Sequence, residues 1–267
     1  MRISKTFPPA VALLLAAVVS SAFAQQSAPP ATSIPPVVAP KPAIEPRAIE
    51  ILKAMSDKLA SAKNLSFVAH GAFDVPAANG QPLFYMTQTE VTLQRPDKLK
   101  VIAASDGSTS EFFYDGKTIA VFMPKENVVA VADAPGNIEA MLEMAYDQAG
   151  IYFPFVDVIV ADPYETLTGG LTSAFVIGQT KLVGGTTTDI VALANDEVQA
   201  QIWIDTQDKL PRLIWVTATK MPEKPRHSVE FTDWKLNAAV DPGAFMSADA
   251  SKAAKIEFAR PDATDTQ

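Results

Sequence analysis

Two histidines, His70 and His227, are the first side chains to consider as a catalytic base or as metal ligands. Neither has a second histidine, a cysteine or a tight carboxylate cluster at the spacing that metal ligands require. The sequence also lacks a G-x-S-x-G turn, an S-x-x-K pair and an H-E-x-x-H helix, which are patterns that place a nucleophile or a zinc ion. The two histidines therefore predict no catalytic centre, no metal site and no cofactor.

The carboxylates give two weaker patterns. Glu139, Glu143 and Asp147 follow one another at four-residue spacing, which puts them on one side of a helix. These three carboxylates could bind a metal ion, but we favour a solvated acidic face near the start of a helix. Asp205 and Asp208 flank a turn that lacks the glycine and terminal glutamate of a calcium loop. A hydrolase built from scattered carboxylates is the weakest of the function hypotheses that we consider below. We predict that the chain is not an enzyme.

Charge and composition exclude several classes of partner. The chain has 267 residues, a formal net charge of −8 and no cysteine. Without a basic cluster, neither nucleic acid nor an anionic lipid surface is an expected partner. Without disulfides, packing alone holds the fold together.

The first residues predict export. Arg2 and Lys5 precede the apolar run 10–19, and Ala22-Phe23-Ala24 has the small-x-small pattern of a signal-peptide cleavage site. We expect cleavage after Ala24 and a periplasmic mature chain without a transmembrane segment, with an uncleaved anchor as the alternative. Residues 1–24 are thus a signal peptide, 25–46 a proline-rich linker, 47–260 a single domain and 261–267 a tail.

Turn residues and alternating apolar residues predict an antiparallel sheet. Asp106-Gly107 and Asp115-Gly116 separate short β-rich runs in the stretch 95–135, which is a strong hairpin signal. The predicted strands are 65–74, 83–94, 99–104, 111–114, 118–123, 128–132, 171–177, 181–183, 187–193, 198–205, 212–219 and 228–236.

Three helical segments are predicted around these strands. An apolar stripe that includes Ile44 and Met55 predicts a helix over 46–62, and a second helix runs from the cap Asn137 to Gly150. The third segment, 151–161, is an apolar loop with a short buried helix that Asp162-Pro163 stops. So many antiparallel strands curl, and the helices are the natural cover of the concave face. The fold class is therefore α+β and mainly antiparallel β.

Several stretches in order resemble the LolA/LolB superfamily of periplasmic lipoprotein carriers. They are Leu93–Lys100, Tyr114–Pro124, Val128–Ala132, Ile202–Asp205 with Leu210–Leu213, Phe231–Asn237 and Asp241–Phe245. Over the whole mature chain, the sequence more closely resembles a family of predicted periplasmic proteins placed in that superfamily. The resemblance implies a half-open, curled β-barrel of the LolA type, wrapped around helices that cover an apolar cavity.

The resemblance also gives Arg95 a possible role. In LolA carriers, the arginine of the Arg-Pro motif helps to hold a helical lid over the cavity, and Arg95 occupies that motif here. The alternative is that Arg95 ends a strand beside the turn that Pro96 sets. Both interpretations stay open at this point.

The first function hypothesis is a periplasmic binding or carrier protein for a lipid or an acylated, lipoprotein-like ligand. The alternative is an envelope sensor or adaptor that binds a protein partner without catalysis. For the first hypothesis, the predicted ligand-binding residues are Arg95 and a set of apolar side chains from strands and helices. The set comprises Val91, Leu93, Phe112, Val121, Ile202, Ile204, Ile214, Phe231, Ile51, Met55, Met141, Leu142, Phe153 and Phe155.

Overall fold

A computed structural model of the chain describes residues 44–105, 108–221 and 224–260. These residues fall within one compact unit. The predicted signal peptide, most of the linker, the Asp106-Gly107 turn and the tail lie outside the described residues. In the described part, no helix has the length and apolar character needed to cross a membrane.

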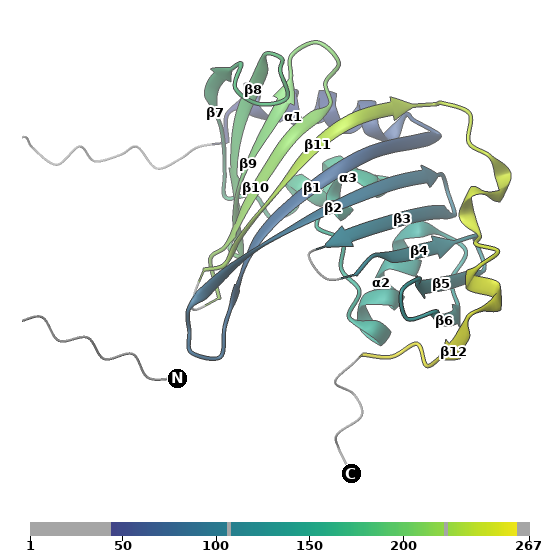
Figure 1. The fold of residues 1–267 in the computed structure, drawn as a ribbon. Helices are drawn as coiled ribbons and strands as arrows, with labels where there is room; N and C mark the ends of the chain where they lie inside the picture. Colours follow the sequence, from purple (N-terminus) through teal and green to yellow (C-terminus); the bar gives the residue numbers. More distant parts are fainter. Residues whose placement is uncertain (1–43, 106–107, 222–223, 261–267) are drawn as a thin grey trace, which may run out of the picture. The chain divides into compact units, whose positions relative to one another are not determined.

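Twelve strands form one large sheet that curls but does not close (Figure 1). Their spatial order is β12-β6-β5-β4-β3-β2-β1-β11-β10-β9-β8-β7, and neighbours are antiparallel except for β12 and β6. The bounds are β1 Asn64–Pro76, β2 Pro82–Gln94, β3 Lys98–Ser105, β4 Ser110–Tyr114, β5 Thr118–Met123, β6 Val128–Asp133, β7 Ser173–Thr180, β8 Thr188–Ala194, β9 Val198–Asp205, β10 Pro211–Ala218, β11 Arg226–Leu236 and β12 Ala254–Ile256. The predicted fold class is confirmed.

Side-chain alternation and turn chemistry explain the strands. In β2, the inward residues Val91 and Leu93 are buried, whereas Glu90, which precedes Val91 and faces the other side of the sheet, is exposed. At the β4–β5 turn, the Asp115 carboxylate accepts hydrogen bonds from the backbone N–H groups of Lys117 and Thr118, both at 2.9 Å. Gly116 supplies the positive φ of 96° that this turn needs.

Four α-helices lie in the described chain: α1 Pro46–Ala60, α2 Ile138–Ala149, α3 Val156–Ile159 and α4 Pro163–Thr168. Two short 3₁₀ turns, Pro242–Phe245 and Ala250–Lys252, follow β11. As predicted, the Asn137 side chain caps α2 by accepting from the Ala140 N–H at 2.8 Å. Gly150 ends α2 with a left-handed φ of 67°.

The structure corrects three details of the prediction. Asp162-Pro163 starts α4 rather than only stopping a helix, because Asp162 accepts from the Glu165 N–H at 3.0 Å and proline suits the first helical turn. The predicted strand 181–183 belongs to a turn, since Gly184 and Gly185 both have positive φ. Ile44 precedes α1 and forms a parallel bridge with Ala174 instead of joining the helix stripe.

The main core lies between the concave face of the sheet and the helices. Its aromatic centre is Phe67 of β1, whose ring centroid lies 5.6 Å from Phe155, 5.6 Å from Phe231 and 4.4 Å from Trp234. Phe231 and Trp234 both point inward because β11 has an irregularity at Asp233, where φ is 55°. Strand, bulge and helix thus converge on one cluster.

Candidate functional site

The predicted ligand-binding side chains lie together in one apolar layer. Most of them are buried in the main core: Val91, Leu93, Phe112, Ile202, Ile204, Ile214, Phe231, Met55, Met141, Leu142 and Phe155. Ile51, Val121 and Phe153 are partly buried and pack against the same core. Strand alternation directs the sheet residues inward, and the apolar stripes of α1 and α2 meet them from the other side.

Residues 151–160, called the plug segment here, fill the concave face opposite β1 and β4. The Phe153 ring lies 5.3 Å from Phe112 in an edge-to-face arrangement and 5.4 Å from Phe155 in a stacked one. Phe155 in turn contacts Phe67 edge-on. In this structure, the protein's own aromatic side chains fill the space in the apolar layer where a bound ligand would have to lie.

An open groove of about 290 Å³ runs along the seam between α2 and the plug segment. Two of the predicted residues, Leu142 and Phe153, line it, together with Tyr146, Tyr152 and Val156. Tyr146 and Tyr152 are exposed. The groove thus lies on the surface beside the apolar layer.

Arg95 lies where this layer meets the start of α2. Its backbone N–H donates to the Lys63 carbonyl at 2.8 Å, and the next residue, Pro96, accepts from the Ile138 N–H at 3.1 Å. The Arg95 Nε and Nη2 atoms are buried and have no hydrogen-bond partner among the described residues. Burial lowers the pKa of this guanidinium, and the charge of Glu139 acts in the opposite direction.

These contacts bear on the two interpretations of Arg95. The backbone bonds fit a residue that ends β2 beside a turn. The side chain makes no hydrogen bond to a helix within the described residues. Glu139, the carboxylate that acts on it, instead accepts from the Ala161 N–H at 2.6 Å. Arg95 is thus a half-buried cation at the edge of an apolar layer, with two buried donors that have no partner among the described residues.

The other chemical candidates are separated in space. His70 pairs across the sheet with Glu230, whereas His227 pairs with Phe73, and burial lowers the pKa of His227. Glu143 and Asp147 are exposed. Among the described residues, no group of three or more His, Cys, Asp or Glu side chains could hold a metal ion.

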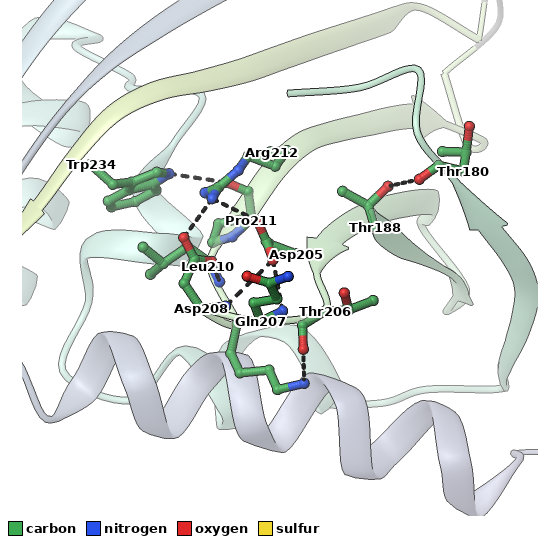
Figure 2. Close-up of polar contacts among 11 residues, drawn as sticks. Thr180, Thr188, Asp205, Thr206, Gln207, Asp208, Leu210, Pro211, Arg212 and Trp234 are labelled. Atoms are coloured by element: carbon green, nitrogen blue, oxygen red, sulfur yellow. Dashed lines mark hydrogen bonds and ion pairs between the residues drawn. The ribbon is translucent and has the colours of Figure 1, made fainter. Parts of the chain in front are cut away.

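Sequence reasoning missed a polar network at the β9–β10 turn (Figure 2). Arg212 Nη2 pairs with Asp205 Oδ2 at 2.9 Å and also with Asp208, while Trp234 donates to the Pro211 carbonyl at 3.0 Å. Burial acts to raise the pKa of Asp205, but hydrogen bonds from Gln207 and Thr186 and the charge of Arg212 hold it below its ordinary value. The Asp-x-x-Asp-x-x-x-Arg spacing was visible in the sequence, but it carried no indication of burial.

The sequence profile of a family described as "Predicted periplasmic protein (DUF2092)" matches residues 48–259. The chain belongs to this family. No curated protein matches the sequence significantly.

Solved structures of similar shape include several envelope proteins. LprF from Mycobacterium bovis has a TM-score of 0.45 and 14% identity, with 75% of this chain and 97% of that chain covered. A chain of the Pseudomonas aeruginosa MucA/MucB complex has a TM-score of 0.41 and 14% identity, with 76% of this chain and 62% of that chain covered. A LolA superfamily protein from Nitrosomonas europaea has a TM-score of 0.32 and 12% identity, with coverage of 75% and 97%. Values this low do not transfer a ligand or a partner to this chain.

Proposed function

We propose that this chain is a periplasmic binding or carrier protein for a lipid or an acylated ligand with an acidic group. The observation that carries the proposal is Arg95, a half-buried arginine at the edge of an apolar layer whose Nε and Nη2 atoms are buried and have no hydrogen-bond partner among the described residues. Buried donors of a cation that lack a partner destabilise the folded chain. An acyl ligand with an acidic group supplies both missing partners, since its chain suits the layer and its anion suits Arg95.

The free energy of acyl-chain burial requires the protein to exchange its own apolar contacts for contacts with the ligand. Each buried methylene contributes about 0.8 kcal/mol, so transferring a long acyl chain from water contributes roughly 10 kcal/mol. A carrier has to match much of this energy and still release its ligand. In the proposed mechanism, the plug segment withdraws from β4 as the acyl chain enters, and one apolar surface replaces another.

Among the described residues, few hydrogen bonds join the helical segment 138–168 to the rest of the fold. They include the bond that the Ile138 N–H donates to the Pro96 carbonyl and the bond that Arg260 Nη2 donates to the Tyr146 carbonyl at 3.0 Å. A segment with few hydrogen bonds to its surroundings opens locally at a lower free energy than a strand in the middle of a sheet. Movement of this segment is therefore the expected route for ligand entry.

The test is native mass spectrometry of the mature protein, purified from periplasm without detergent. We expect adduct masses that match a phospholipid or an acylated peptide. Hydrogen exchange with and without the extracted ligand then locates it, with slower exchange expected in residues 138–168. A bare mass, together with no response to an environment-sensitive acyl probe, would reject the proposal.

Export is part of the same proposal. The family description is periplasmic, and we propose that a signal peptide is removed after Ala24. Sequencing the N-terminus of the protein recovered from periplasm should begin at Gln25. An N-terminus at Met1 in a membrane fraction would instead indicate an uncleaved anchor.

A protein partner is the second candidate function, and the edge strand β7 favours it. At this edge, the Glu45 N–H donates to the Ala174 carbonyl at 2.7 Å, and the Val176 N–H donates to the Glu45 carboxylate at 3.0 Å. Residues 177–180 continue β7 beyond these contacts, so a partner strand could add there. A stable complex with an envelope protein, in a preparation that carries no lipid, would favour this candidate over the first.

A further inference from the structure

The hairpin formed by β1 and β2 extends beyond its neighbours in the sheet (Figure 1). The ladder with β11 ends at Phe73 opposite His227, and the ladder with β3 ends at Thr87 opposite Ser105. Residues 74–76 pair with residues 82–84 alone among the described strands, and Tyr85 and Met86, opposite Phe73 and Ala72, have no partner on the β3 side. We call these residues, with the turn between them, the apolar ribbon.

Large apolar side chains are exposed on both faces of the ribbon. Val75, Leu83 and Tyr85 continue the inward-facing rows of β1 and β2, whereas Phe84 and Met86 point to the opposite side. All five are between 37% and 64% exposed. Exposed apolar residues gathered in one place indicate a binding surface, while scattered ones are ordinary.

The exposure of apolar side chains on both faces distinguishes a protein partner from a lipid bilayer. A protein surface docked on a ribbon covers one face and leaves the other in water. The interface of a lipid bilayer surrounds an inserted hairpin tip, so it buries both faces at once. Phe, Met and Leu side chains suit the acyl boundary, and Tyr suits the headgroup region.

The charges around the ribbon select among lipids. Asp74 is the one charged residue between positions 74 and 86. Beside it, Arg226 stacks over Trp215 at 5.8 Å, and both line a groove of about 450 Å³ with Asp74 and Phe84. Within this groove, one cation, one anion and an aromatic ring match a zwitterionic headgroup. The net charge of −8 disfavours a strongly anionic surface.

We propose that the apolar ribbon inserts into the interface of a zwitterionic phospholipid bilayer. Insertion brings the protein to a membrane without a transmembrane helix. The proposal is independent of what the interior binds. It assigns a function to a hairpin whose exposed side chains contribute little to the core.

Single-cysteine labelling tests the two-sided burial directly, because the chain has no cysteine. Leu83→Cys and Phe84→Cys of the mature protein are labelled with an environment-sensitive fluorophore and mixed with dioleoyl-phosphatidylcholine vesicles. We expect a blue shift and quenching by lipid-borne quenchers at both positions. Leu182→Cys is the control, since Leu182 is 93% exposed and lies in the β7–β8 turn outside the ribbon.

An unlabelled pair of variants measures the contribution of the side chains. Phe84→Ser combined with Met86→Ser should weaken the vesicle partition coefficient by about tenfold or more. Leu182→Ser combined with Met246→Ser removes two exposed apolar residues elsewhere and should leave partition unchanged. Both double variants should keep the wild-type melting temperature and the wild-type response to a free acyl probe. Loss of the probe response alone would count against the interior site and not against the ribbon.

Three results would overturn the proposal. A spectral shift at Leu83→Cys or Phe84→Cys but not at both would indicate one-sided docking on a protein. Binding that requires phosphatidylglycerol would indicate a basic surface elsewhere. A concentration-dependent shift without vesicles would indicate a second copy of the chain on the ribbon.

Discussion

Arg95 carries a charge that its surroundings compensate poorly, because two of its buried donors have no partner among the described residues. Methionine in its place retains the length of the apolar stem and removes the Nε and Nη2 atoms, which are buried without a partner in the described chain. We expect Arg95→Met to leave the free energy of unfolding unchanged or to raise it by about 1 kcal/mol. Affinity for an acidic acyl ligand should fall by about tenfold or more. Urea denaturation and calorimetric titration measure the two effects.

Lys58→Met serves as the control for Arg95, because it removes a cation from the exposed side of α1. It should alter neither stability nor affinity. If Arg95→Met instead lowers stability by about 2 kcal/mol while affinity is retained, Arg95 has a structural role at the end of β2. The opposite signs of the two expected effects separate a binding residue from a packing residue.

Asp205 should contribute stability that depends on pH. Its pKa is held below the ordinary value in the folded chain, so its contribution is present above the unfolded pKa and is lost as the pH falls through the folded one. Asp205→Asn should cost about 3 kcal/mol at neutral pH, since it leaves the largely buried Arg212 with a weaker pairing. The difference between wild type and variant should shrink below about pH 4.

Asp208 provides the matched control in the same turn. Its side chain is 42% exposed and pairs with the same arginine. Asp208→Asn should therefore cost less than about 1 kcal/mol. Urea midpoints measured between neutral pH and pH 3 compare the two variants, and equal losses would contradict the assignment of Asp205 as the buried partner.

At the scale of elements, the bulge in β11 directs two aromatic rings into the core. Asp233 is exposed and has a φ of 55°, a conformation that β-branched residues adopt at high cost. Asp233→Val should lower the free energy of unfolding by about 1–2 kcal/mol. Asp233→Gly should be neutral or slightly stabilising, because glycine takes this conformation freely. Thermal unfolding of the two variants measures the difference, and equal effects would show that backbone conformation is not the cause.

Local signals in the sequence were sufficient to predict most helices, strands and turns. Asp115-Gly116 predicts its hairpin because a side-chain oxygen and a positive φ act within four residues. Asn137 and Gly150 predict the ends of α2 for the same local reason. Alternation in β2 also predicts that Val91 and Leu93 point inward. These properties depend on neighbours along the chain.

The missed features depend on residues far apart in the sequence. The parallel pairing of β12 with β6 joins Ala254 to Val128, and no local pattern encodes that contact. The unpartnered donors of Arg95 result from the packing of α2 over the end of β2. Likewise, the sequence shows that Phe153 and Phe155 are apolar, but not that they pack into the concave face as a plug.

At the scale of the whole molecule, one core cluster joins the two halves of the sheet. Leu93 on β2 and Ile202 on β9 are both fully buried in it, although β1, β11 and β10 lie between their strands. The helices pack against the same cluster. A protein held together in this way, with no disulfide, should unfold in a single cooperative transition.

Two truncations, one in each half of the sheet, test this cooperativity. Leu93→Ala and Ile202→Ala should each lower the free energy of unfolding by about 3 kcal/mol, through lost burial and the cavity left behind. Tryptophan fluorescence reports on β9–β11, which contain Trp203, Trp215 and Trp234, whereas far-UV circular dichroism reports on every strand. In each variant, both signals should share one urea midpoint. If Leu93→Ala lowers the midpoint by circular dichroism but leaves that by fluorescence in place, the halves unfold separately. The helices would then cover two cores, and an acyl ligand would stabilise one half alone.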